Sequence, residues 1–533
     1  MESQFWADKK AFEIYNKRNF KYLSKEAPDF KKHVIKTSAS ISGVLHIGRL
    51  SDTIRSETVY QSLLDSGNTA ELIWVAEDMD PLRKIPEGIS KKFKDYLGMP
   101  VIDVPDPWGC HNSYAAHHIT EYFDVIHEFV NNDLIPYSMK DEYKKGNFKP
   151  FISKLLKNLS LLIQIQNKYR KTPLRTDWSP WIPTCKNCGK IITSRIKKFE
   201  DNILTYKCED YLFEKTRAKG CGYEGEASPL KDKGKLMWKG EWAAQWKRWK
   251  ITSEGAGKEY VVPYSAWWVN AEIVERILDH PMPIPIFYEH IMVNGKKMSA
   301  SIGNVVYPKE WLSVASPQLL RFYYNKKLMK TRSFSWHSLP NLYDEYDRHS
   351  SIYQKGGSDK STLQKGRLFE ISQLQKIDQP FKLSFSHAAF LSQMFFEEKE
   401  IIASLRRSGH YDKDNIVSIL KRIKLASNWV ENFAPLDMKR KDIKINILKE
   451  TLNKKQRKFL GEISAFLSKD REPDEIHEKI YSLSKDLDIQ TGKAFQCIYL
   501  AVIGKKTGPK AGNLLSSLDK KWIVQRFMDI AEL

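Results

Sequence analysis

Apolar runs and helical patterns alternate near the start of the chain. HVIKTSA (33–39) and AELIWVAED (70–78) are mostly apolar runs of strand length, as expected for buried parallel strands. Between them, Ile47, Leu50 and Ile54 recur at steps of three and four, which predicts one apolar face of a helix. A strand, a crossover helix and a second strand form the unit of a doubly wound α/β fold, whose ligands bind at the carboxyl ends of the strands.

This alternation predicts four parts of the chain. Residues 1–105 form the first half of a doubly wound, Rossmann-like α/β domain, and 106–235 interrupt it with an insertion that holds five of the six cysteines. The α/β character returns in 236–339, where IPIFYEHIMVNG reads as one strand. Residues 340–533 are predicted to be helical, with a flexible loop at 353–361.

Composition and charge add a class of partner. Hydrophobic residues make up 41% of the chain, which indicates a globular protein. The formal net charge of +21 favours a polyanionic partner such as a nucleic acid, although a lysine-rich solvated surface gives the same excess. Because there is no long apolar run and the charged amino terminus lacks a signal-peptide core, we expect a cytoplasmic protein without a membrane partner.

The stretch SGVLHIGRL (42–50) predicts a glycine-rich turn into a helix. Free backbone N–H groups and the positive end of the helix dipole at such a turn suit a phosphate. Gly43 and Gly48 allow close approach to the backbone, and His46 can donate a hydrogen bond to a phosphate oxygen. Taken alone, a histidine in such a turn is usually structural, and the chain contains no P-loop motif.

A second candidate motif is GKKMSASIGN (295–304), which follows a predicted strand. A mobile loop with a lysine and two hydroxyls, here Lys297, Ser299 and Ser301, suits the charge that develops on a pyrophosphate. Taken alone, this stretch is also compatible with an ordinary surface loop.

The two motifs together resemble the paired signatures of class I aminoacyl-tRNA synthetases. Further stretches, among them VAEDMDPLRKIP (75–86) and KLMWKGEWAAQWKRW (235–249), resemble the class I lysyl-tRNA synthetases typical of archaea over most of residues 30–330. The resemblance implies a Rossmann-like doubly wound parallel sheet, an inserted zinc-binding domain, and an all-α anticodon-binding region at the carboxyl terminus.

The same resemblance implies a lysine–tRNA ligase. Such an enzyme activates lysine with ATP and Mg²⁺ to lysyl-adenylate and transfers the lysyl group to tRNA(Lys). The expected catalytic residues are His46, Lys297 and Ser299. The expected ATP-binding residues are Ser42, Gly43, His46, Gly48, Arg49, Lys297, Met298, Ser299 and Ser301.

Clustered cysteines in a cytosolic chain indicate metal rather than disulfides. Cys185 and Cys188 have the spacing of a zinc knuckle, and Cys208 and Cys221 supply an expanded second half. Buried thiols are the alternative. PDPWGCHNSYAAHH (105–118) offers a second set of four ligands for a tetrahedral zinc ion. The alternative is that its histidines only cap a helix or pack in the core. The resemblance supports two structural Zn²⁺ ions. The expected ligands there are Asp106, Cys110, His111 and His117.

A buried lysine substrate requires carboxylates for its ammonium, and an aromatic wall adds cation–π attraction. Glu77, Asp78 and Asp80 at a strand end are the candidate carboxylates, and Trp242 is the candidate wall. Trp242 and Trp246, four residues apart in one helix, also fit ordinary core packing. The resemblance shifts Trp242 towards the pocket.

The chain departs from the family pattern at three places. Arg49 stands where the family usually has Asn, Ile41 where it has Pro, and Tyr260 where it has His, within the bulky segment GKEYVVPYSAWWVN (257–270). Two alternatives stay open: a class I synthetase of glutamate-like specificity, and an inactive synthetase-like protein that binds RNA. The acidic cluster at 77–80 argues against the first, and the intact motif at Lys297 argues against the second.

Overall fold

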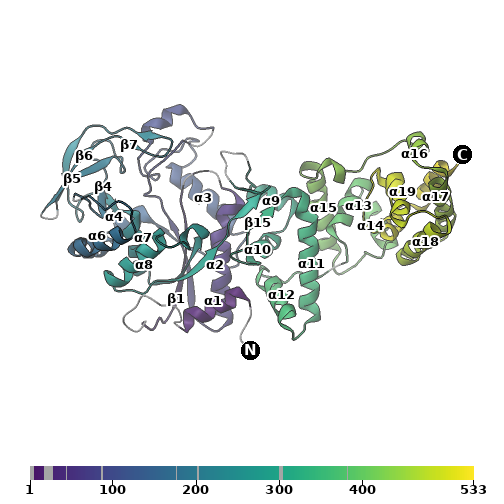
Figure 1. Cartoon of the computed structure of the whole chain (residues 1–533), viewed down its shortest axis with the longest axis horizontal. Coiled ribbons are helices and arrows are strands. Elements are labelled where there is room, and N and C mark those ends of the chain that lie inside the picture. Colours follow the sequence, from purple (N-terminus) through teal and green to yellow (C-terminus); the bar gives the residue numbers. More distant parts are fainter. Residues whose placement is uncertain are drawn as a thin grey trace. The chain divides into compact units, whose positions relative to one another are not determined.

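The computed structural model divides the chain into two compact units (Figure 1). The first comprises Met1–Pro308, Pro317–Phe334 and Lys355–Ile377, and the second Lys309–Ser316, Ser335–Gln354 and Asp378–Leu533. The structure describes residues 5–16, 28–41, 43, 45–85, 88–175, 177–200, 203–298, 304–380, 382–395 and 397–532. Three predicted site residues lie outside the described residues: Ser42, Ser299 and Ser301.

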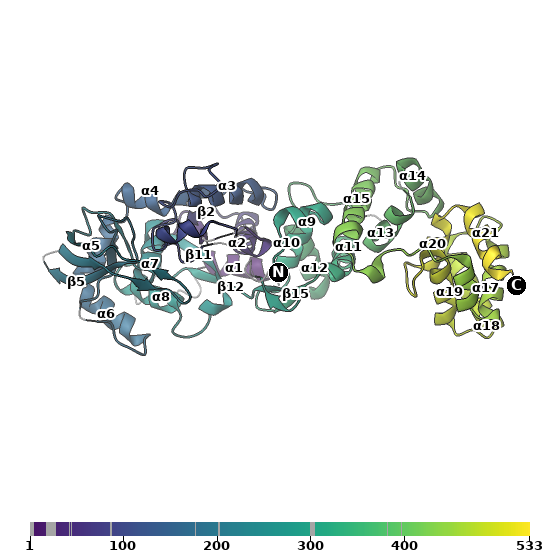
Figure 2. The same ribbon diagram turned by 90° about the horizontal axis from the view of Figure 1, so that it is seen from above.

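A five-stranded parallel sheet forms the centre of the first unit (Figure 2). Its strand order is β12 (Ile284–Tyr288), β11 (Ile251–Gly257), β1 (His33–Ala39), β2 (Ala70–Ala76) and β3 (Ile135–Ser138). The predicted strands at 33–39 and 70–78 are confirmed as β1 and β2. The chain leaves β1 towards β2 on one side and returns at β11 on the other, so the switch point of the sheet lies between β1 and β11.

Helices cover both faces of this sheet. The predicted crossover helix is α2 (Ile47–Asp65), with Ile47, Leu50 and Ile54 on its buried face. Glu254 of β11 contacts α7 (Trp238–Arg248), whereas a side chain on the next residue, Gly255, would meet α2. Because successive residues of a strand point to opposite faces, α2 and α7 lie on opposite sides of the sheet.

The segment between β2 and α7 mixes helices with small sheets. β5 (Ser194–Glu200), β6 (Ile203–Cys208) and β9 (Glu224–Ala227) form an antiparallel sheet. This predicted insertion also supplies the edge strand β3 of the parallel sheet. The remaining elements are η1 (Lys91–Tyr96), α3 (Tyr114–Ile126), α4 (Met139–Lys144), α5 (Lys149–Lys157), α6 (Leu159–Lys168), β4 (Trp181–Pro183), β7 (Tyr211–Leu212), β8 (Arg217–Ala218) and β10 (Gly234–Leu236).

The prediction of one strand in IPIFYEHIMVNG is wrong. The stretch holds two strands, because β13 (Ile291–Val293) leaves the parallel sheet and pairs with β14 (Lys296–Lys297) and β15 (Arg332–Phe334). Asn294 and Gly295, both at positive φ, form the two-residue turn between β13 and β14. This hairpin carries Lys297.

The predicted helical region is confirmed. Residues 356–359 connect α11 (Leu339–Lys355) to α12 (Lys360–Ile371), which belongs to the first unit. They lie within the predicted loop at 353–361. Cys497 is buried, as expected of a core thiol.

No described helix has the length and apolar character needed to span a membrane. The other helices are α1 (Trp6–Tyr15), η2 (Lys258–Tyr260), α8 (Ala266–Arg276), α9 (Pro308–Val314), α10 (Pro317–Asn325), η4 (Trp336–Ser338), α13 (Phe385–Met394), α14 (Glu398–Arg407), α15 (Ile416–Asn432), η5 (Leu436–Met438), α16 (Ile445–Thr451), α17 (Lys454–Leu467), α18 (Pro473–Asp486), α19 (Thr491–Ile503), α20 (Ala511–Ser517) and α21 (Lys520–Ala531).

Candidate active site

His46 is the amino-terminal cap of α2 and follows the last residue of β1, Ala39, by seven positions. Its backbone is extended, and its side chain does not cap the helix. Burial, followed by the nearby charge of Arg49, lowers the pKa of His46 to about 4, so the imidazole is neutral at pH 7. A neutral imidazole can still donate one hydrogen bond from a ring nitrogen.

The two sequence motifs meet at Gly48. A Cβ on Gly48 would lie 2.9 Å from both His46 Nδ1 and Met298 Cε, a spacing that real Cβ atoms do not tolerate. The absence of a side chain at this helical position therefore lets the methionine of the second motif pack against the first. Residues 46 and 298, far apart in the sequence, are thus brought together.

Arg49 lies over the turn that follows β1. Its Nη1 donates to the Ser40 carbonyl at 3.3 Å, and its Nη2 would be 3.8 Å from a Cβ on Gly43, whose φ is +130°. A side chain at that φ is disfavoured, which explains the glycine. The half-buried guanidinium therefore adds positive charge beside the turn.

The predicted carboxylates at the end of β2 have partners within the protein. Glu77 is buried and accepts a hydrogen bond from Gln245 Nε2 at 3.1 Å. Asp78 accepts hydrogen bonds from the Ser138 hydroxyl and from the Lys140 backbone N–H at the start of α4. Asp80 forms an ion pair with Lys235 at 2.8 Å.

Trp242 faces a buried acid that the sequence did not single out. Its indole Nε1 lies 3.1 and 3.0 Å from the two carboxylate oxygens of Glu254 on β11. Trp246 Nε1 donates to the same carboxylate, and Lys36 of β1 pairs with it at 2.6 Å. Lys36 and Glu254 are almost fully buried, so this ion pair lies inside the sheet at the switch point.

A second unpredicted acid, Asp52, lies on the other face of β11. A Cβ on Gly255 would be 2.1 Å from Asp52 Oδ1, so only glycine admits the carboxylate here. The Tyr288 hydroxyl and the Ser38 backbone N–H are hydrogen-bond donors to the Asp52 carboxylate, although no donor among the described residues reaches its buried Oδ1 with good geometry. Burial, and then the negative charge of Glu254, raises the pKa of Asp52 to about 7.

Lys297 contacts His290, which follows β12 and in turn contacts Glu259, which follows β11. Its ammonium lies 3.3 Å from His290 Nε2, and the same ring nitrogen lies 2.9 Å from Glu259 Oε2. The hydrogen bond with His290 lowers the pKa of Glu259 to about 2, so this carboxyl group is ionised at neutral pH.

The altered segment at 257–270 packs behind the tryptophans. Tyr260 lies edge-on to Trp242, with 5.2 Å between ring centroids, and Trp267 lies edge-on to it at 5.4 Å. Trp267 is fully buried, whereas Trp268 is half-buried. The added bulk at 267 therefore packs against both Trp242 and Trp246.

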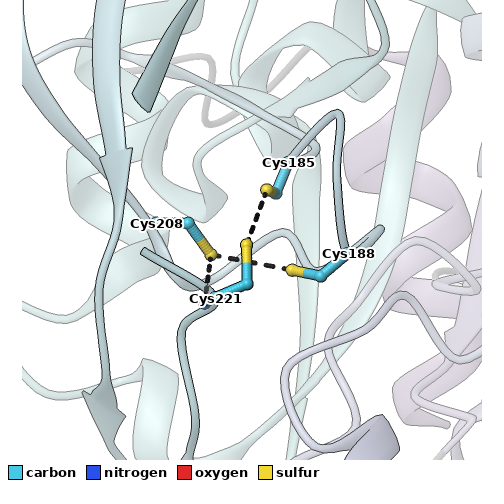
Figure 3. Close-up of side chains that lie close together, drawn as sticks. All are labelled: Cys185, Cys188, Cys208 and Cys221. Atoms are coloured by element: carbon cyan, nitrogen blue, oxygen red, sulfur yellow. Dashed lines mark hydrogen bonds between the residues drawn. The ribbon is translucent and has the colours of Figure 1, made fainter. Parts of the chain in front are cut away.

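The four predicted cysteines come together in the segment between β2 and α7 (Figure 3). Their sulfur atoms lie within 4.8 Å of one another, with 3.7 Å between Cys185 and Cys221 and 3.6 Å between Cys188 and Cys208. Tetrahedral zinc with bonds of about 2.3 Å places its sulfur ligands about 3.8 Å apart. The donor set therefore fits a structural zinc ion.

The second predicted set also converges, at the amino-terminal end of α3. One donor atom from each of Asp106, Cys110, His111 and His117 lies within 4.8 Å of the others. Cys110 Sγ is 3.1 Å from His111 Nδ1 and 3.2 Å from His117 Nδ1. One thiol, one carboxylate and two imidazoles are all zinc ligands, so this set also fits the ion. His118 points to Glu121, at 3.1 Å.

Two of the acids in this site escaped the sequence reading. Glu254 had a weak signal, as the single acidic residue of the strand ITSEGAG. Asp52 had none, because one aspartate in an amphipathic helix normally faces solvent. Their burial follows from the return of β11 beside β1, which sequence periodicity cannot predict.

Comparison with known proteins agrees with this arrangement. Residues 4–375 match the family model described as tRNA synthetases class I (K), and residues 388–531 match a model described as an anticodon binding domain.

Similar proteins include three archaeal lysine–tRNA ligases. The ligase of Methanocaldococcus jannaschii is 31% identical, with 93% of this chain and 96% of that protein covered. The ligase of Methanosphaera stadtmanae is 29% identical, with 95% and 97% covered. The ligase of Pyrococcus furiosus is 30% identical, with 98% of each chain covered. The first family model alone spans more than half of the sequence, and the chain therefore belongs to the class I (K) tRNA synthetases.

Proposed function

We propose that this chain is a lysine–tRNA ligase, which forms lysyl-adenylate from lysine and ATP and transfers the lysyl group to tRNA(Lys). The observation that carries the proposal is the packing of Met298 against Gly48 and His46 at the carboxyl end of β1. This packing joins two candidate phosphate-binding motifs, and the carboxylates of Asp52, on α2, and Glu254, on β11, lie on opposite faces of the neighbouring strand β11.

Activation requires no protein nucleophile. ATP enters with Mg²⁺, and the lysine carboxylate attacks the α-phosphorus in line, with pyrophosphate as the leaving group. The neutral His46 imidazole, the Arg49 guanidinium and the Lys297 ammonium stabilise the charge that builds on the phosphates. The remaining proposed phosphate contacts come from Ser42, Gly43, Gly48, Met298, Ser299 and Ser301. The tRNA ribose 2′-hydroxyl, characteristic of class I, then attacks the activated carbonyl and loses its proton, the acyl–phosphate bond breaks, and AMP leaves.

Asp52 is the best-placed carboxylate for the ammonium of the substrate. Its Oδ1 is buried and has no partner in the described residues, while Asp78 and Asp80 already pair with protein groups. A cation entering the pocket favours ionised Asp52, whereas a glutamate side chain would place a further carboxylate beside Asp52 and Glu254. Glu77 and Trp242 complete the proposed lysine pocket.

We further propose that Cys185, Cys188, Cys208 and Cys221 hold one structural zinc ion, and that Asp106, Cys110, His111 and His117 hold another. Four protein ligands at each site leave no position for a substrate, so both ions stabilise the fold. For the helical residues 388–531 we propose binding of the anticodon arm of tRNA(Lys), with the net positive charge drawing the RNA to the surface.

ATP–pyrophosphate exchange with each of the twenty amino acids, with tRNA(Lys) present, tests the activity. We expect exchange with lysine alone. Exchange with glutamate would contradict the specificity. Exchange with no amino acid, together with retained tRNA binding, would contradict the enzymatic function.

A further inference from the structure

Three residues from separate elements converge on one atom beside the ATP site. His290 follows β12, Glu259 belongs to η2, and Lys297 ends β14. His290 Nε2 lies 2.9 Å from Glu259 Oε2 and 3.3 Å from Lys297 Nζ. The imidazole therefore stands between a carboxylate and the ammonium expected to bind phosphate.

The protonation of this nitrogen makes the two contacts exclusive as hydrogen bonds. If Nε2 carries a proton, it donates to Glu259; if it carries a lone pair, it accepts from the Lys297 ammonium. When Lys297 leaves for another partner, His290 is free to donate to Glu259. When the Lys297 ammonium leaves, His290 and Glu259 therefore still have each other as hydrogen-bond partners.

Gly257 provides the space for the Glu259 carboxylate. A Cβ on Gly257 would lie 2.5 Å from Glu259 Oε2 and 3.0 Å from Oε1. Any other residue at this position would push the carboxylate away from His290. The carboxylate is thus held at a defined place at the carboxyl end of β11.

We propose that Glu259 and His290 are positioning residues that retain the Lys297 ammonium beside the ATP site until the triphosphate displaces them. The inference rests on the proposed function, because it needs the site to bind ATP. Without ATP, the Glu259 carboxylate balances the charge of Lys297 through His290. The triphosphate carries more negative charge and takes the ammonium. The proton of His290 then shifts from Nδ1 to Nε2 by exchange with water, and Nε2 donates to Glu259.

This competition has a measurable sign. Because Lys297 must leave a partner before it contacts phosphate, part of its attraction for ATP is offset by the loss of that partner. Removal of the carboxylate in Glu259→Gln should therefore tighten ATP binding, by about threefold, the scale of one exposed ion pair. A residue that only supported the local fold would weaken ATP binding when changed.

The experiment is a double-mutant cycle on the full chain with ATP and Mg²⁺ as the probe. Dissociation constants are measured by calorimetry for the unchanged protein, Glu259→Gln, Lys297→Ala and the double variant. We expect Glu259→Gln to bind ATP more tightly than the unchanged protein. When Lys297 is already Ala, we expect the same change to leave the affinity for ATP as it is. Unchanged or weaker binding in Glu259→Gln, or an equal gain in both backgrounds, would overturn the inference.

A neighbouring carboxylate supplies the matched control. Glu289 pairs with Lys258 at 2.9 Å rather than with Lys297, so Glu289→Gln should leave the affinity for ATP unchanged.

The two proposals fail in different ways, because calorimetry with ATP but without lysine does not depend on turnover. Failure of lysine-dependent exchange in the unchanged protein would therefore reject the proposed function, whereas additive ATP affinities would reject only the role of Glu259. If the unchanged protein bound no ATP, both would be rejected.

Discussion

Asp52 is half-buried as a residue, but its carboxylate is enclosed by the protein, and this enclosure affects its proton. The folded-state pKa of about 7 lies above the value of about 3.9 for an exposed aspartate, so the folded empty site holds a proton that the unfolded chain releases. The resulting stability is present below pH 4 and is lost as the pH rises towards 7. A bound ammonium reverses this preference, because it favours the ionised carboxylate.

This linkage predicts the pH dependence of lysine binding. The dissociation constant for lysine should fall as the pH rises from 6 to 8. Asp52 in the empty site is then increasingly ionised, so fewer protons must be released when lysine binds. Asp52→Asn should weaken lysine binding by about tenfold or more, the scale of one charged hydrogen bond, and should remove this pH dependence. Calorimetric titration with lysine at several pH values measures both effects.

Asp65→Asn is the control, since Asp65 ends the same helix and pairs with Arg367 instead. It should keep both the affinity for lysine and its dependence on pH. An Asp52→Asn protein that bound lysine as tightly as the unchanged one would remove Asp52 from the proposed pocket.

The periodicity of apolar residues predicts some helices and strands of this chain but not others. Strands β1 and β2 and helix α2 followed from their apolar patterns, and the convergence of the four cysteines followed from their spacing. The set at 106–117 was predicted from its spacing together with the family resemblance. The break between β12 and β13, at Glu289 and His290, did not, because two polar residues do not by themselves end a strand, and the two strands differ in their partners. Glu254 and Asp52 were missed for the same reason: strand order, not local pattern, determines their burial.

The segment between β2 and α7 is where metal removal should act. Metal analysis of the purified chain should find about two zinc ions per molecule, one of which is lost in Cys188→Ser and the other in Cys110→Ser. A thiolate is a much stronger zinc ligand than a hydroxyl, so each change leaves an incomplete set. Chelation should also lower the thermal stability of the chain, because zinc binding contributes to folding.

Cys497→Ser is the matched control for these variants. Cys497 is a buried thiol on α19 whose sulfur contacts the Lys493 carbonyl, so its loss should leave the zinc content unchanged. A preparation with one zinc per chain that Cys110→Ser does not reduce would contradict the second site.

For the chain as a whole, the net charge of +21 predicts salt-sensitive binding of tRNA. Helix α17 buries Phe459, Leu460 and Ile463 and exposes Lys454, Lys455 and Lys458. Replacing these three lysines by glutamine should weaken binding of tRNA(Lys) and reduce the dependence of log Kd on log salt by about one per lost phosphate contact. Filter binding over a range of salt concentrations measures this slope.

The corresponding triple substitution by arginine keeps the charge and should keep the slope. A glutamine variant with an unchanged slope would place the RNA on another surface. Its thermal stability should stay near that of the unchanged chain, because all three side chains are exposed.

The position of β11 in the sheet also imposes an order on synthesis. β1 pairs with β2 soon after both leave the ribosome, but its other edge stays bare until β11 is made more than 200 residues later. At about 5–20 residues per second this interval lasts about 10 to 40 s, during which an unpaired edge invites aggregation. Cys221 precedes β11 by 30 residues, so all four cysteines proposed to bind zinc are synthesised before the sheet closes. Zinc shortage is therefore expected to harm the growing chain before it harms the finished enzyme.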